Sequence, residues 1–245
     1  ITDYKNDHDK FSNLNVYPAV EVTTDKEAHV LVYGLQDEIK SNQTIDEILD
    51  AAKVQDAVTI APHPFSLVDA LRDDSLKCDL FEVFNSSNVD LHSNKKAEIF
   101  AKDNNLLTTA GSDSHVASTI GRCTNLINSE NNLDDVISAM KKGKISIEKT
   151  EYITRREILE HIRYKVENSK DYIDQYVQEF YPKYSWLFNL MYRSYMFTKK
   201  SLIWDATLKI ALFGLRRISY KINFEGYDPS AFRTRDIPTI TKMIF

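Results

Sequence analysis

Runs of β-branched and other apolar residues alternate with amphipathic segments along residues 1–150, and this alternation restricts the fold more than any other feature. Strands bounded by turn-forming residues are expected at 16–24, 28–34, 58–65, 79–85, 105–110, 122–128 and 145–148. Helices with one apolar face are expected at 44–54, 88–104 and 133–142. Strands that alternate with helices predict an α/β fold with a mostly parallel sheet, whose functional residues gather at one end.

Two of these helices carry signals at their ends. Thr44 and Glu47 have the spacing of a capping box, which predicts the start of the first helix. Gly143 follows the helix expected at 133–142, and glycine commonly ends a helix.

The chain divides into two parts of different charge. Residues 1–150 carry 15 Lys and Arg against 25 Asp and Glu, a balance of −10, whereas residues 151–245 carry 16 against 11, a balance of +5. We therefore expect one domain at 1–150 and a helical C-terminal region at 151–245. The last residues of that region, with Gly226, Pro229 and Pro238, are expected to form an extended tail.

The composition excludes several classes of protein. The six glycines include no Gly-x-Gly pair, which excludes the usual cradles for dinucleotides and nucleotide phosphates. Cys78 and Cys123 are isolated, so we expect a reducing compartment rather than a disulfide framework. The sequence shows no signal peptide and no charge-free stretch of about 18 residues, and a cytoplasmic protein is therefore expected.

Five side chains that can bind metals or protons lie at or beside the expected strand ends: Glu21, His29, His63, Asp113 and His115. Glu21 stands inside an apolar run, where a buried carboxylate needs a partner or a cation, although it can also lie on a partly exposed face. Two prolines fix the backbone around His63, and a glycine precedes the pair Asp113 and His115. Taken alone, each segment is also compatible with a polar turn or a structural histidine.

These ligand types indicate a particular class of metal. Mixed histidine and carboxylate ligands suit zinc, manganese or iron better than calcium or magnesium. One carboxylate can bridge two metals, and two close metals can activate water for displacement at phosphorus. The residues thus favour the hypothesis of a metal-dependent hydrolase.

Six motifs follow one another in a familiar order: ITDY, YPAVEVTT, HVLVYG, APHPF, FEVFNSS and TAGSDSH. In this order and spacing they resemble the motifs of the PHP (polymerase and histidinol phosphatase) domain, in its branch of small metal-dependent phosphoesterases. The resemblance covers roughly residues 1–150. It implies a distorted seven-stranded β/α barrel that lacks its first strand, with two or three divalent transition metal ions (Mn, Zn or Fe) at the strand carboxyl ends.

The resemblance also implies a role for each candidate ligand. Glu21 would bridge two metals and Asp113 would serve the first of them, while His29 and His63 would serve the second and His115 the third. Phosphate esters would be hydrolysed by a metal-activated hydroxide, with Glu21, Asp113 and His115 as the catalytic residues.

Substrate binding is assigned to two further residues. Asn85 can orient the substrate or only cap a turn, and Arg122 can hold a phosphate or form a surface ion pair. The side chain of Glu82 is expected on the opposite face of its strand from the side chains of its apolar neighbours, and we expect it to have a structural role. The expected substrate is a phosphorylated small molecule, a nucleotide or a nucleic-acid end.

Two departures from the family pattern affect the expected metal count. The family begins with a His-x-His pair on a first strand, which this sequence lacks, and we expect that segment to precede Ile1. The family also has a histidine where this chain has Tyr4, whose phenol is a poor ligand, so we expect an altered third site with His8 as a substitute. The alternative function is a catalytically degenerate PHP-like barrel that binds a ligand or partner without turnover.

The C-terminal region combines aromatic and basic residues. This combination is compatible with a surface that stacks bases and binds phosphates, and with amphipathic helices on a membrane. We favour a third interpretation, a helical layer that covers the barrel or joins two copies of the chain, with the basic residues on its solvated face. The aromatic residues are Tyr184, Trp186, Phe188, Tyr192, Tyr195, Phe197 and Trp204.

Overall fold

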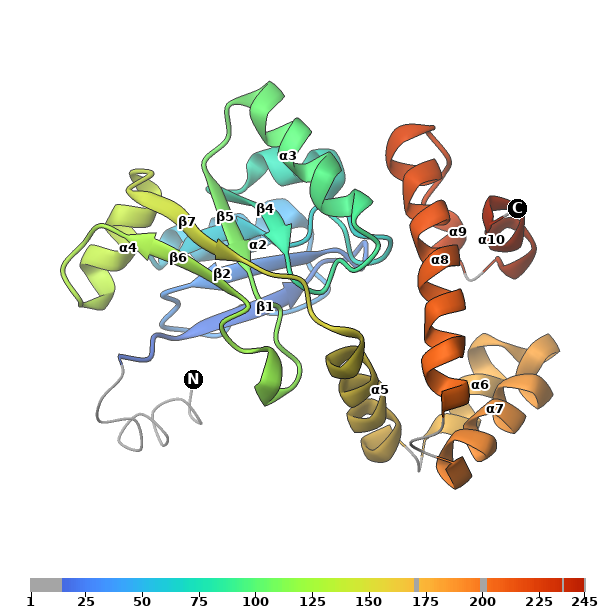
Figure 1. Ribbon diagram of the computed structural model, residues 1–245. Helices are drawn as coiled ribbons and strands as arrows, with labels where there is room; N and C mark the ends of the chain where they lie inside the picture. The colour runs from blue at the N-terminus through green and yellow to red at the C-terminus, as the bar shows by residue number, and fades with distance from the viewer. Residues whose placement is uncertain (1–14, 170–171, 199–201, 235, 245) are drawn as a thin grey trace.

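The computed structural model describes residues 15–169, 172–198, 202–234 and 236–244. Five of the described strands form one sheet in the spatial order β1-β2-β3-β4-β5, and two more form a separate antiparallel ladder. In Figure 1 the labelled strands lie together, with α5 to α10 to one side of them. The strands of the sheet are β1 (Ala19–Thr23), β2 (His29–Tyr33), β3 (Val58–Ala61), β4 (Leu80–Asn85) and β5 (Thr108–Gly111). The separate ladder consists of β6 (Cys123–Ile127) and β7 (Ile145–Thr150).

The expected seven-stranded β/α barrel is wrong: the described strands form an open five-stranded sheet and a separate ladder, with no closed barrel among them. The end of β5 shows the physical reason. The side-chain amide of Asn125 accepts a hydrogen bond from the Ala110 amide at 3.0 Å and donates one to the Ala110 carbonyl at 2.8 Å. Because a side chain satisfies these edge groups of β5, the main chain of β6 does not continue the sheet there.

The expected mostly parallel sheet is also wrong in part. β3, β4 and β5 are parallel, but β1 pairs antiparallel with β2, and β2 pairs antiparallel with β3. Residues 24–28 are too few to form the crossover that a parallel β1–β2 pair would need. Because of this reversal, the end of β1, the beginning of β2 and the end of β3 lie at the same end of the sheet.

Helices cover both faces of the sheet. α2 (Ile45–Val54) and α3 (His92–Asn104) pack on one face, and α4 (Leu133–Lys141) packs with β6 and β7 on the other. The capping box at α2 is formed: the Thr44 hydroxyl accepts from the Glu47 amide, and the Glu47 carboxylate accepts from the Thr44 amide. Gly143 follows α4 with a φ of 68°, a conformation that glycine adopts without a steric penalty.

The region after β7 is helical, and it lies to one side of the sheet in Figure 1. In the part of the chain that the structure describes, 3₁₀ helices occur at Arg72–Lys77 and Ala117–Thr119 before β7, and at Pro182–Tyr184 after it. No helix among the described residues has both the length and the apolar character needed to cross a bilayer. The helices of this region are α5 (Arg155–Ser169), α6 (Ile173–Phe180), α7 (Ser185–Thr198), α8 (Leu202–Phe224), α9 (Ser230–Arg233) and α10 (Ile237–Ile244).

The last two helices stand where we expected an extended tail. Asp236 begins α10 as its N-cap, since its carboxylate accepts hydrogen bonds from the amide and the hydroxyl of Thr239. Pro238 lies in the first turn, where a missing amide proton costs no helical hydrogen bond. Met243 is buried against Ile218 of α8.

α8 is attached to the sheet region by buried polar contacts. The Ser219 hydroxyl donates to the carboxylate of Asp90, just before α3. Asn223 donates to the carbonyl of Phe65 at 3.2 Å and accepts from Arg72 at 3.3 Å. These contacts connect the C-terminal helices to the segments that follow β3 and β4.

Candidate metal centre

Three candidate ligands meet toward the end of the sheet where β1 ends, β2 begins and β3 ends. Glu21 lies on β1, His29 begins β2 and His63 follows β3. The Glu21 Oε1 atom lies 3.1 Å from Nδ1 of His29 and 3.3 Å from Nε2 of His63. One ligand atom from each residue lies within 4.8 Å of the other two, so this group can hold a metal ion.

The surroundings of His63 indicate which of its nitrogens is free. The Ser66 hydroxyl donates its one proton to the Val68 carbonyl, while its oxygen lies 3.3 Å from Nδ1 of His63. Nδ1–H of His63 is then the donor to Ser66, so in the neutral imidazole the lone pair lies on Nε2. A lone pair 3.3 Å from a carboxylate oxygen requires a proton or a cation between the two atoms.

His29 strengthens the case for a cation. Its Nδ1 atom is buried and, although it lies close to Glu21, makes no hydrogen bond of acceptable geometry within the described structure. One cation placed among the three groups would satisfy this nitrogen together with Glu21 and His63. A carboxylate with two imidazoles is a suitable donor set for zinc, manganese or iron.

The charges around the site favour an ionised Glu21 and a protonated or cation-bound His63. The imidazole of His29, and then that of His63, lies close to the Glu21 carboxylate and holds the pKa of Glu21 well below its usual range. Burial opposes protonation of His63, but the contact with Glu21 and the charges of Glu82 and Asp113 raise its pKa overall.

Asp113 shares a cavity with two of these ligands. The cavity has a volume of about 460 Å³, and its polar lining residues include Glu21, His63, Asp113, Glu82 and Asn85. Apolar side chains of β2, β6 and α4 line it as well. Asp113, at a φ of 45°, lies two residues beyond the end of β5. Glu21, His63 and Asp113, which come from separate segments of the chain, therefore line the same cavity.

The structure places the remaining predicted residues elsewhere. His115 does not line the cavity: its Nδ1 lies 3.0 Å from the Asp113 carbonyl, and its ring stacks on that of His161 from α5 at 4.5 Å. Arg122 donates to Glu151 at 2.9 Å and also to Glu157. Tyr4 and His8 lie outside the described residues.

Asn85 lies in the cavity wall, but both ends of its side-chain amide are engaged. It donates to Glu82 Oε2 at 2.9 Å and accepts from the Ser87 amide at 2.8 Å. The residue thus holds a turn and a carboxylate in place.

Sequence reasoning missed two residues beside the predicted ligands. Glu82 is buried and faces the cavity, although its position in an apolar strand suggested only a structural role. The sequence did contain a signal, namely a carboxylate within an apolar run, since a carboxylate that is buried needs a partner. His161 gave no signal, since nothing in an amphipathic helix indicates which remote loop it contacts.

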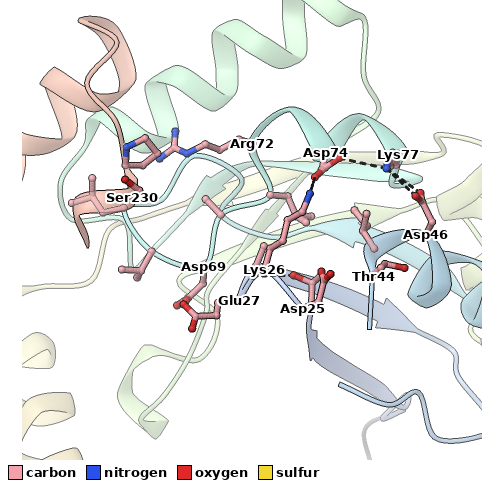
Figure 2. Close-up of a pocket in the computed structure, with 18 of the residues that line it drawn as sticks. Asp25, Lys26, Glu27, Thr44, Asp46, Asp69, Arg72, Asp74, Lys77 and Ser230 are labelled. Carbon is pink, nitrogen blue, oxygen red and sulfur yellow. Dashed lines mark hydrogen bonds and ion pairs between the residues drawn. The ribbon is translucent and has the colours of Figure 1, made fainter. Parts of the chain in front are cut away.

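A second cavity, of about 470 Å³, lies beyond the β1–β2 turn (Figure 2). Figure 2 shows its lysines paired with carboxylates: Lys26 with Asp74, and Lys77 with Asp74 and Asp46. No second group of metal-binding side chains like that of Glu21 occurs among the described residues. The first cavity is therefore the better candidate site.

Comparisons with known proteins agree with the motif pattern. Residues 92–145 match the family model described as PHP-associated, a segment that includes Asp113 and His115. The chain is also 26% identical to the "Uncharacterized protein MJ0417" of Methanocaldococcus jannaschii over 172 aligned positions, which cover 66% of each chain. The chain thus spans about two thirds of the length of that relative.

Proposed function

We propose that this chain, which is related to the PHP family, is a metal-dependent phosphoesterase that hydrolyses the phosphate esters of small molecules or nucleotides. PHP proteins are commonly phosphoesterases, and this resemblance supports the reaction class. The observation that carries the proposal is the convergence of Glu21, His29 and His63 beside a cavity that Asp113 also lines.

The three converging residues would hold one cation. A bound divalent metal of this class supplies charge stabilisation at a phosphoryl group and lowers the pKa of water toward neutrality. Glu21 is suited to the ligand role because its neighbours keep it ionised. In the neutral imidazole, Nε2 of His63 carries a lone pair and lies 3.3 Å from the Glu21 carboxylate.

Asp113 would act within the same cavity. Its carboxylate can bind a further cation or accept a hydrogen bond from the substrate or water. The cavity volume of about 460 Å³ is in the range of small-molecule sites, and this supports a phosphorylated metabolite or a nucleotide as substrate. Arg122 is not included, because Glu151 and Glu157 bind its guanidinium group.

The experiment is to load the full chain with Mn²⁺ or Zn²⁺ and measure both bound metal and hydrolysis of a generic phosphomonoester. We expect at least one metal per chain, with turnover that falls to background in Asp113→Ala. His92→Ala is the matched control, because His92 packs against Tyr220 and Phe224 away from the cavity. A chain that binds metal but hydrolyses no ester would instead be a binding module, and a chain that binds none would contradict the proposal.

A further inference from the structure

Glu82 is a carboxylate at the centre of β4 with only 4% of its surface exposed. The other residues of β4 are apolar or amide side chains, and no cationic side chain donates a hydrogen bond to Glu82 within the described structure. Burial of a carboxylate costs free energy unless the group is paired or hydrogen-bonded, so its partners indicate its role.

The first partner is the backbone of a candidate metal ligand. Glu82 Oε2 accepts a hydrogen bond from the amide of His63 at 2.6 Å. Pro62 and Pro64 have no amide proton, so His63 offers the one backbone donor in residues 62–64. The φ of His63 is 29°, a conformation that a residue with a side chain keeps only when its surroundings impose it.

The second partner is the end of β5, which leads to Asp113. A Cβ atom added to Gly111 would lie 1.8 Å from Glu82 Oε1, so the carboxylate fits there only because residue 111 has no side chain. Asn85 fixes the other side of the carboxylate by donating to Oε2 at 2.9 Å. Glu82 therefore lies between the segments that carry His63 and Asp113.

We infer that Glu82 is a positioning residue of the metal centre, whose hydrogen bond to the strained His63 backbone directs the His63 imidazole toward Glu21. This inference rests on the proposed metal site. Groups that orient a metal ligand without touching the metal commonly change the metal affinity about 10- to 100-fold.

The test uses two substitutions that separate the contact of Glu82 from its charge. Glu82→Gln keeps the shape and an acceptor oxygen but removes the charge, whereas Glu82→Asp keeps the charge and withdraws it from the His63 amide. We expect Zn²⁺ affinity, measured by competition with a chromophoric chelator, to fall about 10- to 100-fold in Glu82→Asp and to stay within about threefold in Glu82→Gln.

Gly111→Ala is the second variant should Glu82→Asp fail to fold. Its methyl group displaces the carboxylate without removing it, and we expect the same loss of affinity. Asp90→Asn is the matched control, because Asp90 is equally buried but binds Ser93 and Ser219 instead of a candidate ligand. We expect its Zn²⁺ affinity to match that of the wild type.

The outcomes distinguish this inference from the proposed function. If the wild-type chain binds no Zn²⁺, the metal site itself is wrong. If the wild-type chain binds Zn²⁺ and the folded Glu82→Asp or Gly111→Ala chain binds it equally well, the positioning role is wrong. A loss in Glu82→Gln without a loss in Glu82→Asp would assign the effect to charge and would also overturn the inference.

Discussion

Nε2 of His63 lies 3.3 Å from Oε1 of Glu21, although 42 positions separate the two residues in the sequence. The contact joins β1 to the loop after β3, and it depends on the antiparallel course of β1 and β2. Because Ser66 occupies the other nitrogen of His63, the pair is arranged to share a cation or a proton.

Glu21→Gln should abolish metal binding while it preserves the fold. The amide has nearly the same shape as the carboxylate but lacks the charge that joins His29 and His63. Substitution of a residue that only orients a metal ligand commonly lowers the metal affinity about 10- to 100-fold. Because Glu21 would bind the metal directly, we expect Glu21→Gln to lower the Zn²⁺ affinity by more than about 100-fold. Metal content after dialysis measures this effect, and stoichiometric metal in Glu21→Gln would contradict it.

Metal removal should lower the thermal stability of the wild-type chain. A ligand present at about 100 times its dissociation constant stabilises the folded state by about 2.7 kcal/mol, which corresponds to about 5–10 °C in Tm for a chain of this size. We expect a chelator to reverse this shift and Glu21→Gln to show none. Melting curves with and without Zn²⁺ provide the measurement, and an equal shift in both chains would indicate binding elsewhere.

Glu157 should make stability depend on acid pH. Burial alone would raise the pKa of Glu157, but the hydrogen bonds from Arg122 and Thr154 outweigh burial and lower it to about 2. A carboxyl whose pKa is lower in the folded state stabilises the fold above its unfolded pKa, near 4.5, and this contribution is lost as the pH falls toward 2.

Glu157→Gln tests this pH dependence. We expect it to lower the free energy of unfolding by about 1–3 kcal/mol at pH 7, and the difference from wild type to shrink between pH 4.5 and pH 2. Urea unfolding at several pH values measures the difference. A difference that is independent of pH would show that the ion pair with Arg122 does not stabilise the chain.

The local elements were predictable because their signals are local. The capping box of Thr44 and Glu47, and the stop at Gly143, depend on spacings of a few residues, and α2 and α4 form where these spacings place them. The open sheet was not predictable in this way. It depends on Asn125, which binds the edge of β5 with its side chain from 15 residues away.

In the candidate site, too, some features were predictable from the sequence and others depend on remote contacts. The order of the motifs indicated that Glu21, His29 and His63 come together, because strand ends meet at a sheet edge. The direction of His115 was not predictable, since it depends on stacking with His161 from a helix outside the motifs. The role of Glu82 was missed because period-two alternation does not show that both faces of β4 are buried.

Ser219→Ala should weaken the attachment of α8 without affecting the metal centre. Ser219 is fully buried, donates to Asp90 and accepts from Asn223 at 3.2 Å. Its removal leaves a buried carboxylate with one fewer donor and a buried amide without this acceptor, so we expect a loss of about 1–3 kcal/mol in the free energy of unfolding. Urea unfolding provides the measurement, with Zn²⁺ affinity as the second readout.

Thr207→Ala on the same helix is the control for this prediction. The Thr207 hydroxyl donates only to the Ile203 carbonyl of its own helix, so its removal should change stability by less than about 0.5 kcal/mol. Equal effects of the two substitutions would show that the contacts of Ser219 do not hold α8 against α3. A loss of Zn²⁺ affinity in a folded Ser219→Ala chain would instead show that α8 and the metal centre are coupled, contrary to the separation that we expect.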